Sequence, residues 1–202
     1  MIDLNKYAQA IHENAKAKGW WDNRARSWPE IRMLAVSEIA EATECVRNGE
    51  PWCWQLREMS AFPQYESNKV KISYGDERWI AQDQIGTGGS YPKPEGEAVE
   101  LVDAVIRTLD YIGYLAKAIG GSPTELESSY SKSKFTRNPL INHDMFCHIL
   151  HGRNGTEYDK MIWMIRKIEE YFDFMGWNFE EILNLKMEFN RTRDYRHGGK
   201  AY

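Results

Sequence analysis

The chain has 202 residues, of which 42% are hydrophobic and 28% charged, a balance that suits one folded domain and excludes a largely disordered chain. No apolar run approaches the roughly 18 residues of a membrane-crossing helix, and the first residues lack the apolar block of a signal peptide, so we expect a cytoplasmic protein. The net charge of −4, from 26 Lys and Arg against 30 Asp and Glu, offers no basic field for long nucleic acid.

Three helices are predicted in the first 120 residues from the spacing of apolar side chains. The first covers about 4–20, the second about 29–47 and the third about 96–119. The second begins at Ser27-Trp28-Pro29-Glu30, which combines a capping box with a proline in the first turn. Residues 51–91 lie between the second and the third, and we interpret them as an insertion that contains a hairpin.

The rest of the chain predicts two further helices. An irregular stretch at about 122–155 precedes a fourth helix over about 157–175. A fifth helix covers about 178–193 and opens on the capping signature Asn178-x-x-Glu181. The predicted fold is therefore all-α: a single domain over 1–202, built as a bundle of about five helices with two irregular insertions.

Two acidic pairs stand out against this pattern. On the second helix Glu38 falls within the apolar stripe, and Glu41 lies at its edge one turn later. A carboxylate in a buried stripe costs several kcal/mol unless it is paired or bound to metal. On the third helix Glu100 and Asp103 lie opposite the apolar face, and alone they suit a solvated surface with an Asp103–Arg107 ion pair.

Taken together, the two pairs predict a metal site. Two antiparallel helices that each carry carboxylates three residues apart can surround Mg²⁺ with four of them. A di-iron bundle would instead use Glu-x-x-His, and no His follows these glutamates at that spacing. The fifth helix adds Lys186, Asn190 and Arg193 on one face, followed by Arg196 and Lys200. These donors suit phosphate groups, although cations also collect at helix C-termini because the helix dipole favours them.

Four blocks of sequence, in order, resemble the all-α NTP pyrophosphohydrolases, the superfamily of MazG-like proteins and dimeric dUTPases, in its phage and bacterial form. The blocks are Ile11-His12-Glu13-Asn14 with Gly19-Trp20-Trp21-Asp22, then Met33 to Glu41, then Lys93-Pro94-Glu95-Gly96 with Glu100-Leu101-x-Asp103, and finally Lys186 to Arg193 with Arg196 to Lys200. They cover about residues 4–50, 92–120 and 176–201. The gap between the acidic pairs is longer than the usual loop of the family, because of residues 51–91.

The resemblance implies Mg²⁺-dependent hydrolysis, with Mn²⁺ as a substitute, of a (deoxy)nucleoside triphosphate to the monophosphate and pyrophosphate, for nucleotide-pool control in a bacterial cell or phage-infected host. It implies a homodimer or homotetramer. The residues that it assigns are the metal ligands Glu38, Glu41, Glu100 and Asp103 and the phosphate contacts Lys186, Asn190, Arg193, Arg196 and Lys200. We add Glu41 as the base that accepts the proton of the attacking water. For the nucleobase we expect His12, Asn14, Trp20 and Trp21, with core packing an equal alternative for the two tryptophans.

Two alternatives stay open. His143, Cys147, His148 and His151 form a tract that could hold Zn²⁺, although such tracts are only compositional evidence. The chain could also be a non-catalytic helical module that binds a nucleotide or a protein, with ordinary salt-bridged faces in place of the metal site. The buried position of Glu38 argues against that module, because a scaffold has no reason to keep a carboxylate in its apolar stripe.

Overall fold

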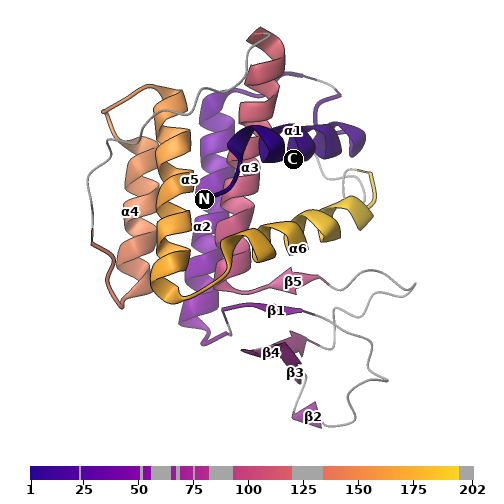
Figure 1. The fold of residues 1–202 in the computed structure, drawn as a ribbon, viewed down its shortest axis with the longest axis vertical. Helices are drawn as coiled ribbons and strands as arrows, with labels where there is room; N and C mark the ends of the chain where they lie inside the picture. Colours follow the sequence, from indigo (N-terminus) through magenta and orange to yellow (C-terminus); the bar gives the residue numbers. More distant parts are fainter. Residues whose placement is uncertain are drawn as a thin grey trace.

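The body of the protein is all-α, as the sequence predicts. The computed structural model describes residues 1–22, 24–50, 52–55, 65–66, 69–74, 76–81, 93–119 and 134–195. Six helices occur in these ranges (Figure 1). They are α1 (Leu4–Ala17), α2 (Trp28–Arg47), α3 (Glu97–Ile119), α4 (Pro139–His151), α5 (Glu157–Met175) and α6 (Phe179–Thr192). None of the helices in the described ranges combines the length and apolarity needed to cross a membrane.

Two small antiparallel sheets lie at one end of the helical body (Figure 1). Strand β1 (Trp54–Gln55) pairs with β5 (Pro94–Glu95), which leads directly into α3. The second sheet has the order β2 (Tyr65–Glu66), β3 (Lys69–Tyr74) and β4 (Asp76–Ala81), with Lys69 opposite Ala81. The hairpin predicted within residues 51–91 is therefore confirmed.

Local capping explains where the helices begin. The Ser27–Glu30 capping box precedes α2, and Thr156 with Asp159 forms a second box at α5. The side chain of Asn178 accepts a hydrogen bond from the backbone N–H of Glu181 at the start of α6. Between α5 and α6, Gly176 adopts a φ of +72°, a left-handed conformation that glycine reaches without steric cost. These signals are local in sequence, so the bounds of these helices follow the prediction closely.

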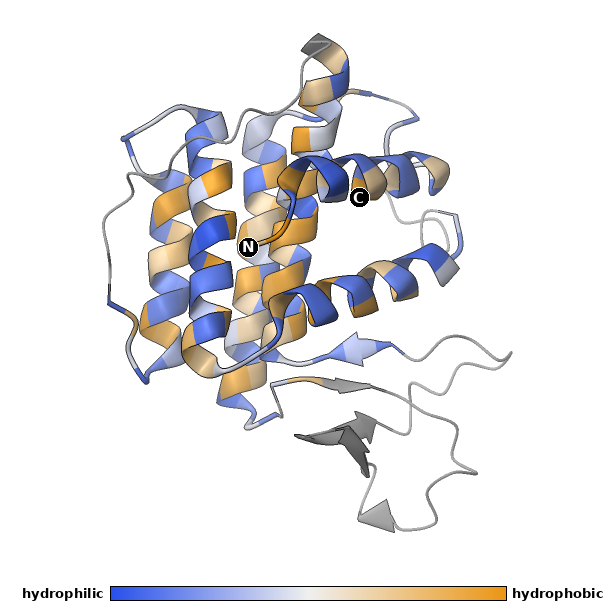
Figure 2. Ribbon diagram, in the orientation of Figure 1, coloured by the Kyte–Doolittle hydropathy of each residue, from blue (hydrophilic) through white to orange (hydrophobic). Residues whose placement is uncertain are grey.

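Helix α3 is the centre of the fold. It packs against α2, α1, α6 and α5, and α2, α4 and α5 stand beside it while α1 and α6 lie across it (Figure 1). Apolar residues gather on the faces where these helices meet (Figure 2). Gly113 lets α1 approach closely, because a Cβ at this position would lie 2.4 Å from the carbonyl oxygen of Ala8. The alternative of a solvated face on α3 is wrong, since α1 and α6 cover it and Glu100 is 3% exposed.

The structure also corrects the prediction for the second insertion. Residues 139–151 form α4, so the fold has one helix more than the five expected. Asn138 caps α4, and Phe146, Ile149 and Leu150 bury its inner face against α5 and α2. Histidines interrupt the apolar spacing of this segment, which is why periodicity alone did not show a helix.

Candidate metal centre

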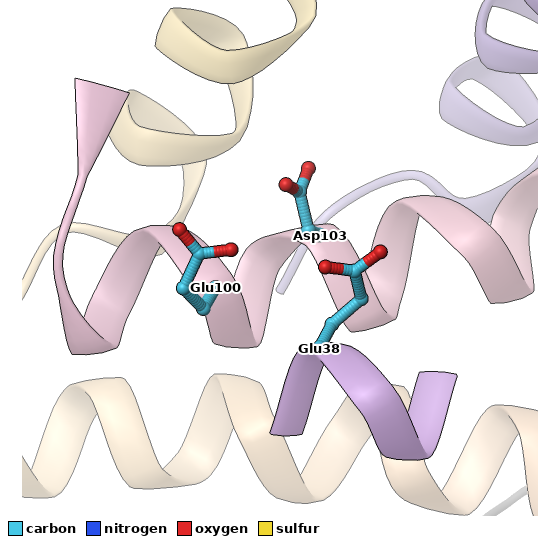
Figure 3. Close-up of side chains that lie close together, drawn as sticks. All are labelled: Glu38, Glu100 and Asp103. Atoms are coloured by element: carbon cyan, nitrogen blue, oxygen red, sulfur yellow. The ribbon is translucent and has the colours of Figure 1, made fainter. Parts of the chain in front are cut away.

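Three carboxylates converge between α2 and α3. Glu38 projects from α2, and Glu100 and Asp103 project from α3 toward it (Figure 3). One oxygen of each carboxylate lies within 4.8 Å of the other two. Both glutamates are buried and Asp103 is partly buried, so water screens these charges poorly. The structure thus brings together three of the four predicted ligands.

Two cations hold this cluster. Nε and Nη2 of Arg107 both lie 2.9 Å from Oε1 of Glu38, and Nζ of Lys186 lies 2.7 Å from Oδ2 of Asp103. In place of the Asp103–Arg107 pair of the solvated-face alternative, each of these two residues forms an ion pair with another helix. Lys186 is 2% exposed, and its ion pair with Asp103 holds that carboxylate in place.

Ionisation of the two buried glutamates remains unfavourable despite these cations. The pKa of Glu100 is raised to about 9, chiefly by burial and also by the charge of Asp103, while the charge of Lys186 acts in the opposite direction. Burial and the charge of Asp103 also raise the pKa of Glu38 against the effect of Arg107. In the absence of a further cation, the site therefore tends to retain protons that ordinary carboxylates lose.

A fourth acidic group, which the sequence did not indicate, lies at this site. Glu95 on β5 is 9% exposed, and its hydrogen bond with Glu100 contributes to the raised pKa of Glu100. Lys93 forms an ion pair with it. The segment Lys93-Pro94-Glu95-Gly96 belongs to the resembling blocks, and in the structure it forms β5, which pairs with β1 and leads into α3.

A cleft begins at the carboxylate cluster and runs between α1, α3 and α6. Predicted residues of three kinds line it: Asp103 from the metal site, Asn190 and Arg193 from the phosphate-binding face, and Asn14 and Trp20 from the base-binding segment. Arg26, Arg107 and Asp110 line it as well. One carboxylate of the cluster, two of the predicted phosphate donors and part of the base-binding segment therefore line one cavity.

His12 and Trp21 meet at Asp110 of α3 and do not line the cleft. Nδ1 of His12 lies 2.8 Å from Oδ1 of Asp110, and Nε1 of Trp21 donates to both oxygens of Asp110 at 3.0 and 3.1 Å. Trp21 also stacks on Tyr114 with ring centroids 4.5 Å apart. These two residues form a wall behind the cleft rather than part of its lining.

The remaining predicted site residues are not brought into the cluster. Glu41 is exposed and one turn from Glu38, close enough for its charge to raise the pKa of Glu38. Its roles as ligand and base stay predictions. Arg196 and Lys200 lie outside the described residues.

The histidine tract of α4 does not form a zinc site within the described ranges, where the only metal-ligand cluster is Glu38, Glu100 and Asp103. His143 is instead buried between helices, with Nε2 at 3.1 Å from Oε1 of Glu97 and Nδ1 at 2.9 Å from Oγ1 of Thr43. His148 and His151 are exposed.

Comparison with known proteins adds no relative: no protein-family profile, no curated protein and no solved structure matches this chain.

Proposed function

We propose that the protein is a nucleoside triphosphate pyrophosphohydrolase, which converts a (deoxy)nucleoside triphosphate to the monophosphate and pyrophosphate. The observation that carries this proposal is the convergence of Glu38, Glu100 and Asp103, together with a cleft that Asp103 lines with Asn190 and Arg193. Phosphate chemistry needs both halves of this arrangement, because anionic oxygens hold a divalent cation and cationic donors neutralise the phosphates. The sequence resemblance points to the same activity, and it also leads us to propose a homodimer or homotetramer.

The donor set suits Mg²⁺, with Mn²⁺ as a substitute. All three groups are carboxylates, which hard divalent cations prefer, and none is a thiolate or an imidazole. Burial, together with the charge of Asp103, raises the pKa of Glu38 and of Glu100, and a bound divalent cation would favour their ionised forms. When bound, Mg²⁺ would supply the charge that neutralises the phosphate oxygens and favours ionisation of a water.

The chain's own residues would then divide the work. Arg193 and Asn190 bind the phosphates from α6, and Lys186 and Arg107 keep Asp103 and Glu38 in position. A water attacks the α-phosphorus, the bond to the bridging oxygen breaks, and pyrophosphate leaves. Glu41, with its exposed carboxylate one turn from Glu38, accepts the proton of that water. Trp20 and Asn14 line the part of the cleft that is available to the nucleobase.

A substrate panel tests the proposal. Pyrophosphate release from each of the common dNTPs and NTPs, with Mg²⁺ or Mn²⁺, is measured by adding inorganic pyrophosphatase and detecting phosphate. Turnover that disappears with EDTA and in Glu38→Gln supports the assignment. The matched control is Glu44→Gln on the same helix, because Glu44 is exposed and pairs only with its neighbour Arg47 among the described residues. Absence of turnover across the panel contradicts the proposal.

One observation favours a second candidate, a non-catalytic helical module that binds a nucleotide or a protein. Arg107 and Lys186 already neutralise part of the acidic cluster, as in an ion-pair network that only stabilises helix contacts. The two functions differ in their response to metal. An enzyme binds Mg²⁺ at this cluster and turns substrate over. A structural network shows no Mg²⁺ binding in isothermal titration and no turnover in the substrate panel.

A further inference from the structure

A second cavity lies between the C-terminal halves of α1 and α3. Its volume is about 250 Å³, and it is lined by His12, Lys16, Trp21, Arg24, Ala25, Tyr114, Lys117 and Ala118. We call it the α1–α3 pocket. It shares no lining residue with the cleft of the metal centre. Its volume is close to the lower end of the roughly 300–1,000 Å³ of small-molecule sites.

The pocket is remote from the metal centre. Asp103 of the carboxylate cluster and Lys117 of the pocket are both on α3, fourteen residues apart in the sequence. At 1.5 Å per residue this spacing corresponds to about 21 Å along the helix. The pocket therefore lies away from the carboxylate cluster, and its aromatic wall contacts the cleft only through Asp110 among the residues named here.

Aromatic rings form one wall of the pocket. The rings of Trp21 and Tyr114 stack at 17° to each other, and His12 meets Trp21 edge-on at 5.0 Å between centroids. Asp110 fixes this wall from behind through its hydrogen bonds to His12 and Trp21. Rigid aromatic surfaces of this kind bind nucleobases, because every base has a π-face that stacks.

Cations form the rim. Lys16 and Lys117 are both exposed, and neither forms an ion pair with another described residue. Both line the same pocket, and the nearby charge of Lys117 lowers the pKa of Lys16. Arg24 is the third cation and pairs with Glu30 at 2.6 Å. Two like charges held together at the mouth of a cavity are relieved by an anion placed between them.

We propose that the α1–α3 pocket is a second nucleotide-binding site, in which a nucleoside phosphate places its base against Trp21 and Tyr114 and its phosphate between Lys16 and Lys117. The proposal does not depend on metal binding or on turnover at the carboxylate cluster. Asp110 contacts the aromatic wall and also lines the cleft, so it connects the two cavities through hydrogen bonds. Neither a base without phosphate nor a phosphate without base satisfies both parts of this site.

The test is equilibrium binding to the full chain in EDTA, measured by isothermal titration with AMP, adenosine and ribose 5-phosphate as probes. AMP is expected to bind at least tenfold more tightly than either fragment. Lys117→Glu is expected to weaken AMP binding at least tenfold. The control Lys6→Glu makes the same charge change at an exposed position on α1 outside the pocket, and it should change AMP binding less than twofold because salt screens distant charges.

Two further variants locate the bound nucleotide. Arg193→Gln removes a cation of the cleft, and AMP binding that survives this change but is lost in Lys117→Glu belongs to the α1–α3 pocket. The reverse result places AMP in the cleft and overturns the proposal. Tyr114→Leu keeps the charge but removes one ring, and it should weaken AMP and leave ribose 5-phosphate unchanged. Equal AMP affinity in Tyr114→Leu and wild type, or no AMP binding at all, also overturns it, whether or not the substrate panel shows turnover.

Discussion

Two buried acidic groups on α3 lie one turn apart and have opposite surroundings. Oε1 of Glu97 accepts a hydrogen bond from the hydroxyl of Tyr171 at 2.8 Å and lies 3.1 Å from Nε2 of His143. Glu100 instead faces Glu38, Asp103 and Glu95. Both glutamates are nearly inaccessible, at 6% and 3% exposed. Burial of a carboxylate does not by itself indicate a functional site. A functional site is indicated when several buried carboxylates lie close together.

The physical reason is the cost of like charges in a poorly screened place. Hydrogen-bond donors satisfy Glu97, so it joins α3 to α4 and α5 and needs nothing further. The carboxylates around Glu100 repel one another, and proteins keep such an arrangement where a ligand relieves it or where chemistry uses it. The comparison predicts that changes at Glu100 act on activity and that changes around Glu97 act on stability.

The largest expected effect is that of Glu100→Gln. Because the pKa of Glu100 is about 9 without metal, glutamine closely imitates its neutral form at pH 7. Metal-dependent turnover should fall by more than about 10²-fold, as expected when a metal-binding group is removed, while the melting temperature of the metal-free protein stays unchanged. Pyrophosphate release and thermal unfolding in EDTA measure the two parts. A large loss of stability with activity retained would mean that Glu100, like Glu97, only stabilises the fold.

Glu41→Gln tests the exposed side of the site. If Glu41 accepts the proton of the attacking water, kcat should fall by about 10²-fold while the Mg²⁺ affinity changes little, since the clustered oxygens of Glu38, Glu100 and Asp103 remain. Turnover and Mg²⁺ titration separate the two roles. A parallel loss of Mg²⁺ affinity would instead make Glu41 a fourth ligand, and unchanged kcat would remove it from the site.

Loss of a hydrogen-bond donor to Glu97 is expected to lower the stability of the fold. Tyr171→Phe removes the hydroxyl that donates to Glu97, and it should cost about 1.5–3 kcal/mol, the range for a hydrogen bond to a charged group. Tyr158→Phe on the same helix is the control, because the buried hydroxyl of Tyr158 has no hydrogen-bond partner in the described part of the chain. Urea unfolding measures both, and equal free energies for the two variants would contradict the role of Glu97.

Local sequence signals predicted where several helices begin and that Glu38 is buried. Contacts between residues far apart in sequence determine the rest of the candidate site. The capping residues around Ser27 and Asn178 and the position of Glu38 in an apolar stripe are readable from neighbours in sequence. The burial of Glu100 is not, because α6 covers it from residues far along the chain. Glu95 lies on β5, which pairs with β1 at the start of the insertion, and this long-range pairing is not readable from neighbours in sequence.

The smallest expected effect is the pH dependence of Mg²⁺ stabilisation. The carboxyl of Glu100 ionises near 4.5 when unfolded and at about 9 when folded without metal. Between these values the folded state binds more protons than the unfolded state, so the contribution of Glu100 to stability falls as the pH rises. Mg²⁺ favours the ionised carboxyl, and its binding must release the proton that the folded protein retains. The rise in melting temperature caused by Mg²⁺ should therefore be larger at pH 8.5 than at pH 6, and Glu100→Gln should remove this difference. An equal rise at both pH values would mean that the metal does not bind where Glu100, Glu38 and Asp103 converge.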